Sequence, residues 1–137
     1  MKKYIMTIAL ILFAICKMFS QNLAETNFVG NWKVKSIEIL KISEDLGNQK
    51  KLEILKKLFL KAKFEFQADK HFNFKFEMKE MELTNKLWKF NSFKNVISVT
   101  ELKDKKSILM EIMVSVENSK TFFILIESPF KLEVTKE

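Results

Sequence analysis

The sequence predicts a mainly β protein, an antiparallel up-and-down barrel of eight strands with one helix between the first two strands. Apolar and polar residues alternate with a period of two over most of the chain after residue 62, which is typical of strands with one buried face. Short turn-forming segments separate these strands, so consecutive strands can pair directly. The stretch before residue 62 differs, because its leucines recur at helical spacing. Closing such a meander into a barrel removes its exposed edges.

The composition indicates one globular domain with few chemically reactive side chains. The chain has 137 residues, of which 47% are hydrophobic and 30% are charged, a balance typical of a folded protein. All 24 basic residues are lysine, and there is one His and one Cys. We therefore expect no enzyme, no cofactor and no metal site. We also expect no nucleic-acid binding, because arginine is absent and the lysines are interspersed with acidic residues.

The first twenty residues have the pattern of a secretory signal peptide. A short positive segment precedes an apolar run over residues 4–16, which Lys17 ends. This run is shorter than the ~20 residues that a membrane-spanning helix needs. We therefore predict a signal peptide over residues 1–20, cleaved after Ser20, and a periplasmic or extracellular domain over residues 21–137.

Cys16 raises an alternative, in which the protein is a lipoprotein anchored in the membrane through this residue. The preceding Ile15 is bulky where a small residue is usual, so we favour an ordinary cysteine in a removed segment. Cleavage at Ala24 is the second possibility for the signal. A chain that begins at Gln21 has no cysteine and hence no disulfide, and its formal charge falls from +7 to +4 because three lysines leave.

The first strand is expected over residues 28–40. Trp32 and Val34 share one parity along it, whereas Ile37 and Ile39 share the other. Because alternate residues of a strand point to opposite faces, the buried face must switch between these pairs. The sequence therefore predicts a β-bulge or a sharp bend near Ser36.

Residues 43–61 are expected to form an amphipathic helix with lysines between its apolar positions. The apolar stripe consists of Leu52, Leu55, Leu58 and Phe59. Ser43 or Asn48 would cap its start, and Gly47 would mark a break or a late start. We favour a surface helix that packs its leucines on the barrel. A cationic helix that binds a membrane surface is the alternative.

Residues 63–78 are expected to form a hairpin that turns at Asp69 and Lys70, with five phenylalanines on one face. These are Phe64, Phe66, Phe72, Phe74 and Phe76. Residues 81–85 are expected to be irregular, and residues 87–90 to form a short strand around Trp88.

Four further strands are expected, over residues 96–101, 108–117, 121–127 and 130–134. The segment 121–127 is apolar at both parities, which predicts a strand that is covered on both faces. Pro129 separates it from the last strand.

The G-x-W motif of Gly30 and Trp32, within residues 27–34, resembles the first strand of lipocalins and fatty-acid-binding proteins, the calycin superfamily. The helix after this strand is similar in placement to the helical lid of fatty-acid-binding proteins. Most closely, the chain resembles small secreted lipocalin-like proteins of Bacteroidetes, which have a second tryptophan strand, here at Trp88. The resemblance covers most of residues 27–135.

The resemblance implies structural roles for the motif. Gly30 would let the backbone pass closely at the closed end of the barrel, and Trp32 would plug that end. In lipocalins a late arginine packs over this tryptophan, so Lys131 or Lys136 would have to replace it unless the contact is absent. Fatty-acid-binding proteins hold a carboxylate with an Arg-x-Tyr arrangement, which residues 21–137 lack. Fatty-acid binding by that mechanism is therefore not expected.

We expect the domain to bind a small hydrophobic molecule in the barrel interior. The expected lining consists of Phe64, Phe66, Phe72, Phe74, Phe76, Met110 and Ile112. The alternative is a packed barrel that acts as a structural or protein-interaction module at the cell envelope. Membrane association is expected only through a lipidated Cys16 or the lysine-rich helix, and the oligomeric state is left open.

The remaining polar residues indicate no site. His71 is expected to be a surface histidine at a hairpin end. The acidic pairs Glu80 with Glu82 and Glu111 with Glu127 are interpreted as the solvated faces of strands and loops.

Overall fold

The computed structural model describes residues 23–40 and 46–137. The expected signal peptide with Cys16, the cleavage site before Gln21 and the capping residue Ser43 lie outside the described residues. The elements in chain order are η1 (Glu25–Asn27), β1 (Gly30–Ile39), α2 (Leu46–Phe59), β2 (Lys63–Phe66), β3 (His71–Lys75), η2 (Lys79–Met81), β4 (Leu83–Asn91), β5 (Val96–Thr100), β6 (Ile108–Glu117), β7 (Lys120–Leu125) and β8 (Phe130–Lys136).

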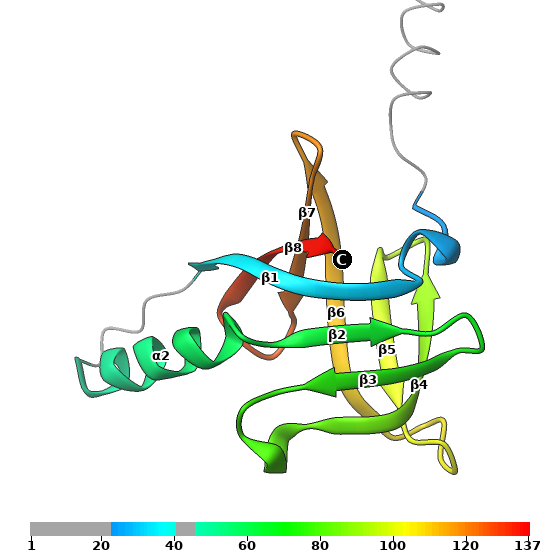
Figure 1. Ribbon diagram of the computed structural model, residues 1–137, viewed down its shortest axis with the longest axis horizontal. Helices are drawn as coiled ribbons and strands as arrows, with labels where there is room; N and C mark the ends of the chain where they lie inside the picture. The colour runs from blue at the N-terminus through cyan, green and yellow to red at the C-terminus, as the bar shows by residue number, and fades with distance from the viewer. Residues whose placement is uncertain (1–22, 41–45) are drawn as a thin grey trace, which may run out of the picture.

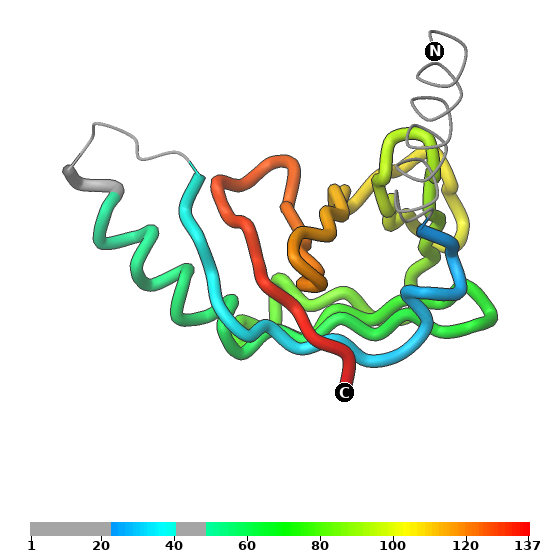
Figure 2. Tube along the Cα trace, turned by 90° about the horizontal axis from the view of Figure 1, so that it is seen from above, coloured from blue at the N-terminus to red at the C-terminus, as the bar shows by residue number. Residues whose placement is uncertain are grey.

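The eight strands form a closed antiparallel barrel in sequence order, with β8 paired to β1 (Figure 1). Within the described part of the chain α2 is the one α-helix, and it follows β1 and precedes β2. Figure 2 shows this helix running beside the second half of β1, outside the ring of strands. The predicted eight-stranded barrel with one helix is confirmed.

The alternation of strand directions gives the barrel two different ends. The turns between β2 and β3, β4 and β5, and β6 and β7 lie at one end, together with η1 and the start of β1. We call this the Trp32 end. The helix α2, η2, the loop after β5 and the turn between β7 and β8 lie at the opposite end, which we call the helix end.

A bulge in β1 switches its buried face, as the sequence predicts. The pairing of β1 with β8 shifts register between Val34 and Ser36. Before the shift Trp32 and Val34 are buried, and after it Ile37 and Ile39 turn toward the core and are half-buried. The strand therefore follows the curved wall of the barrel without placing its apolar residues in water.

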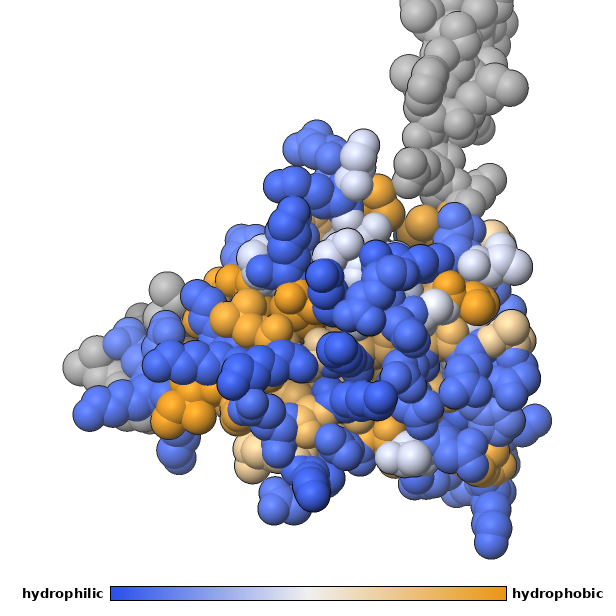
Figure 3. Space-filling model, in the orientation of Figure 1, coloured by the Kyte–Doolittle hydropathy of each residue, from blue (hydrophilic) through white to orange (hydrophobic). Residues whose placement is uncertain are grey.

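Aromatic rings fill the Trp32 end of the interior. All five phenylalanines of the β2–β3 hairpin are buried, as predicted. Phe123 of β7 lies among them, with its ring centroid 5.4 Å from that of Trp32, 5.3 Å from that of Phe64 and 6.0 Å from that of Phe66. These distances are typical of packed aromatic pairs. The face of the molecule shown in Figure 3 is in contrast mostly hydrophilic, with apolar areas where α2 meets the strands.

The helix begins earlier than two of the sequence signals indicate. Both Gly47 and Asn48 lie inside α2, so Gly47 does not break the helix and Asn48 does not cap it. A glycine in a helix costs about 1 kcal/mol, which packing of the apolar stripe can offset. Phe59 in the last turn is buried, and the three leucines of the stripe are partly buried against the core.

Strand β4 is longer than expected, because a bulge extends it toward its start. It begins at Leu83, four residues before the predicted strand. Asn85 adopts a left-handed conformation with φ 54°, and the pairing of β3 with β4 shifts register between Phe72 and Phe74. The Asn85 amide donates to the side-chain oxygen of Asn73, 2.7 Å away. The bulge interrupts the alternation, which is why residues 81–85 appear irregular in the sequence.

Two further expectations are wrong. Strand β3 ends at Lys75, so Met78 lies outside it and is exposed. Strand β7 is not covered on both faces, because its outward residues Phe122 and Ile124 are only half-buried. The Lys131 ammonium lies 4.6 Å from the Phe122 ring centroid. The side chain of a neighbouring lysine therefore partly shields this ring.

Candidate functional site

The G-x-W motif closes the Trp32 end. The Trp32 indole N–H donates to the Phe28 carbonyl at 2.8 Å. Gly30 has φ +134°, and a Cβ there would lie 3.3 Å from Cδ of Lys136. The Lys136 ammonium lies 5.3 Å from the Trp32 ring centroid and donates to the Asn27 carbonyl at 2.9 Å. Of the two lysines considered, Lys136 therefore lies over the tryptophan, and Lys131 does not.

A second set of contacts holds η1 against the same end. The Glu25 carboxylate accepts hydrogen bonds from the Lys70 ammonium and from the Phe90 backbone N–H. The hydrogen bond from Lys70 is the main cause that lowers the pKa of Glu25. Phe28 packs on Phe90, with ring centroids 4.7 Å apart. This end is consequently covered by the chain itself.

The helix end carries a groove of about 470 Å³, which we call the helix-end groove. Its lining comes from α2, β3, η2, β4, β6, β7 and the turn after β7. The lining residues are Phe59, Phe74, Glu80, Met81, Leu83, Ile108, Leu109, Met110, Glu111, Leu125, Ile126, Glu127 and Ser128.

The groove exists because β6 is longer than β7. Pairing between these strands begins at Ile112 and Leu125, so residues 108–111 extend past the end of β7. One further backbone hydrogen bond joins the Ile126 N–H to the Glu111 carbonyl at 3.1 Å. Ile108, at the start of β6, is 55% exposed, because the pairing of β5 with β6 shifts register and places it opposite Thr100 on the outer face.

Nine of the thirteen residues that line the helix-end groove are apolar. Phe59 and Phe74 both contribute to its lining, with ring centroids 6.4 Å apart. Four of the exposed large hydrophobic residues of the protein lie around it. They are Met81, Ile108, Leu109 and Ile126. Clustered exposed apolar side chains at a concave surface are typical of a binding site.

Three carboxylates lie in the same lining, and no lysine does. Glu80 comes from η2, Glu111 from β6 and Glu127 from the turn after β7. The sequence interpretation assigned the pair Glu111 and Glu127, and Glu80 with Glu82, to solvated faces of strands and loops, whereas the barrel brings Glu80, Glu111 and Glu127 to one groove. Glu82 has a different role, because its carboxylate accepts the Phe76 backbone N–H at 3.3 Å.

The residues expected to line an internal ligand site divide into two groups. Phe74 and Met110 line the helix-end groove. The others belong to the buried core and lie outside that lining. They are Phe64, Phe66, Phe72, Phe76 and Ile112. Sequence reasoning missed Phe59, Met81 and Ile126 as lining residues, because their positions depend on how the helix and two turns meet the barrel.

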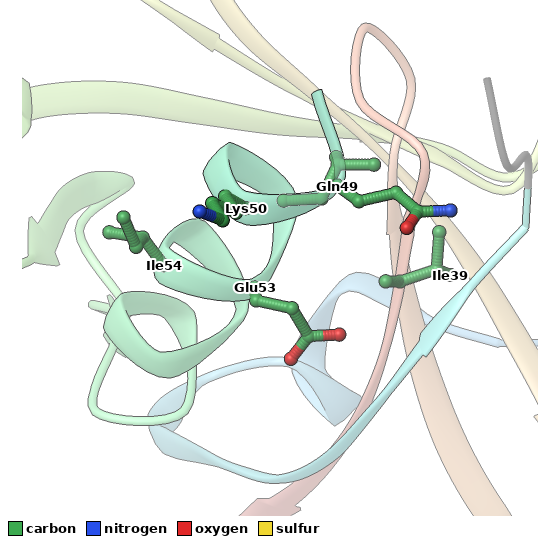
Figure 4. A pocket seen from close by; sticks show the side chains of 6 residues that line it. Ile39, Gln49, Lys50, Glu53 and Ile54 are labelled. Carbon is green, nitrogen blue, oxygen red and sulfur yellow. The ribbon is translucent and has the colours of Figure 1, made fainter. Parts of the chain in front are cut away.

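Two other hollows, like the helix-end groove, are lined by both apolar and polar residues. One of about 610 Å³ lies between α2 and the end of β1, where Gln49 and Glu53 are on the helix side that faces Ile39 (Figure 4). The other, of about 580 Å³, lies on the outside of β4 and β5. It is lined by Trp88 and three lysines, one of which is paired with Glu25.

The described residues show no candidate metal site. His71 is half-buried at the β2–β3 turn, and its Nδ1 lies 3.0 Å from the Asp69 carboxylate. Over residues 23–40 and 46–137, no three His, Cys, Asp or Glu side chains are grouped so that they could hold a metal ion. In the same ranges, no helix has the length and apolar character that crossing a membrane requires.

No protein-family model, curated protein or solved structure matches this chain. The fold and the groove define its class, which is a closed eight-stranded antiparallel barrel with an apolar groove at its helix end.

Proposed function

We propose that the protein is an exported, lipocalin-like binding protein that holds a small apolar molecule in the helix-end groove. The observation that carries this proposal is a concave site of about 470 Å³, nine of whose thirteen lining residues are apolar, at the one end that η1 and Trp32 do not cover. This volume lies in the range of small-molecule sites. Apolar groups that leave water there supply the binding free energy.

The proposed ligand lies at the mouth of the barrel and not in its centre. The rings of Phe123, Trp32 and Phe64 occupy the interior toward the Trp32 end. Phe59, at the end of α2, lies between that core and the groove and packs on Phe76 and Phe130, with ring centroids 4.8 Å and 5.2 Å apart. This position of the helix supports the proposed kinship with fatty-acid-binding proteins, where a helical lid lies between the first two strands.

A packed barrel that acts as a protein-interaction module at the cell envelope is the second candidate. The dense aromatic packing around Phe123 favours it, because a filled interior needs no ligand. In that case the exposed apolar residues of the groove would contact a protein partner. The two functions differ in whether a small apolar probe binds the isolated protein.

Displacement of the neutral fluorophore N-phenyl-1-naphthylamine by octan-1-ol tests the proposal. The informative variant is Ile126→Asn, at the groove, and its matched control is Met113→Asn, outside it. The two side chains are 41% and 42% exposed, so neither change empties the core. We expect saturable binding that Ile126→Asn weakens severalfold and Met113→Asn leaves unchanged. Absence of saturable binding to the folded protein, or equal losses in both variants, would overturn the proposal.

A further inference from the structure

The charges around the helix-end groove have the opposite sign from those of the chain as a whole. The sequence has 24 basic and 17 acidic residues. The lining of this groove nevertheless contains Glu80, Glu111 and Glu127 and no lysine, whereas lysines line both other hollows. The three carboxylates come from three different elements, so they border the apolar walls from several directions.

These three carboxylates have no lysine partner, whereas seven of the fifteen acidic residues in the described ranges do. Glu25, Glu65 and Glu117, for example, pair with Lys70, Lys75 and Lys131. Among residues 23–40 and 46–137, no lysine or histidine lies within ion-pair distance of Glu80, Glu111 or Glu127. Their negative charge is therefore available to a ligand in the groove.

We infer that the ligand is a cationic amphiphile, with an apolar chain in the groove and an ammonium group at the carboxylates. This inference rests on the proposed function, and it specifies the chemical class of the ligand. Glu111 is half-buried and Glu127 is exposed, so an ammonium at either carboxylate would gain a charge-assisted hydrogen bond and stay partly hydrated. A ligand with a carboxylate head would be repelled by the same groups.

Three ligands with one chain and different heads separate the charge effect from the apolar effect. Octylammonium, octan-1-ol and octanoate compete for the same fluorophore at neutral pH and low salt. We expect octylammonium to bind about tenfold more tightly than octanoate, with octan-1-ol between them, because each partly exposed pair contributes only a few-fold in affinity. Added salt should narrow this difference.

The variant for this test is the double change Glu111→Gln with Glu127→Gln. Its matched control, Glu38→Gln with Glu53→Gln, removes the same charge at positions that do not line the groove. We expect the preference for octylammonium over octanoate to fall below about threefold in the first variant and to stay at about tenfold in the control. The single change Glu80→Gln, on η2, should lower the preference by a smaller factor.

The outcomes distinguish this inference from the function on which it rests. If octan-1-ol binds but octylammonium and octanoate bind equally, the cationic ligand is excluded and the apolar site stands. If the control variant lowers the preference as much as the groove variant, the effect is one of net charge and the inference is overturned. If none of the three displaces the fluorophore, both the inference and the proposed function are overturned.

Discussion

Lys136 lies over the indole of Trp32, with its ammonium 5.3 Å from the ring centroid and 2.9 Å from the Asn27 carbonyl oxygen. One side chain near the end of β8 therefore ties the last strand to the segment that enters β1. The sequence has no arginine for the place over this tryptophan that lipocalins fill with one, and of Lys131 and Lys136 it is Lys136 that lies there. Its methylene groups also lie against Gly30, where a Cβ would be crowded.

Replacement of this lysine should weaken the Trp32 end without emptying the core. Lys136→Met removes a cation–π contact and a hydrogen bond at an exposed site, so we expect a loss of about 1 kcal/mol in the free energy of unfolding. Lys136→Arg should retain most of it. Denaturant unfolding measures both, with Lys103→Met in the exposed loop after β5 as the control. Equal stability of the Lys136→Met and Lys103→Met variants would contradict a role for this contact.

Trp32 and Trp88 should contribute similarly to stability. The sequence suggests a smaller effect for Trp88, because it places this residue in a short strand near a turn. The structure places it inside the nine-residue β4, where it is 2% exposed against 7% for Trp32. Each indole N–H also has a backbone acceptor, Phe28 for Trp32 and Gln67 for Trp88. Both alanine variants should lose about 3 to 5 kcal/mol in denaturant unfolding, and a loss below 1 kcal/mol in either would refute this assignment.

Stability should fall in acid partly through Glu25. Its pKa in the folded protein is lowered from the ordinary 4.5, chiefly by the hydrogen bond from Lys70. The ionised carboxylate therefore stabilises the fold above about pH 4.5, and this contribution is lost as the pH falls through the lower folded-state value. Glu25→Gln should be less stable than wild type at pH 7 and should approach it in acid. Unfolding curves across this pH range measure the difference in stability between wild type and Glu25→Gln, with Glu38→Gln as the charge control. A difference that does not change with pH would contradict a role for Glu25.

Substitutions of Phe74 and Phe66 should have different effects on ligand affinity, although both residues are buried in the same hairpin. Phe74 lines the helix-end groove, whereas Phe66 packs on Trp88 at the opposite end, with ring centroids 5.2 Å apart. Phe74→Leu should shift the affinity for octan-1-ol by less than about tenfold, because roughly volume-conserving changes cost below about 1.5 kcal/mol. Phe66→Leu should leave it unchanged. Phe74→Lys should abolish binding or folding, since the ammonium has no partner there. Equal effects of the two leucine variants would place the ligand deeper in the barrel.

Local patterns in the sequence predict the strands well, because alternation and parity are properties of neighbouring residues. The change of parity between Val34 and Ile37 is sufficient to predict the β1 bulge. The extension of β4 is not predictable in this way, because the left-handed Asn85 interrupts the alternation that would reveal it. An asparagine tolerates this conformation better than most residues, but its type alone does not distinguish a bulge from a loop.

The helix-end groove depends on distant pairings and therefore leaves little trace in the sequence. It forms because β7 stops at Leu125 while β6 continues down to Ile108, and the relative length of two paired strands is not a local property. After β7 the chain turns, and the hydrogen bond from the Ile126 N–H to the Glu111 carbonyl brings the next residue, Glu127, close to Glu111. Alternation predicts the inward position of Met110, but only the end of the neighbouring strand determines that it lies at a surface groove.

Methyl NMR of methionine-labelled protein during titration with octan-1-ol tests the central claim most directly. Met81 and Met110 line the helix-end groove, whereas Met78 and Met113 are exposed outside its lining and serve as internal references. The proposed site predicts saturable shifts of the Met81 and Met110 methyl signals with little change at Met78 and Met113. Saturable shifts confined to the reference methyls, or no saturable shift at any of the four, would contradict it.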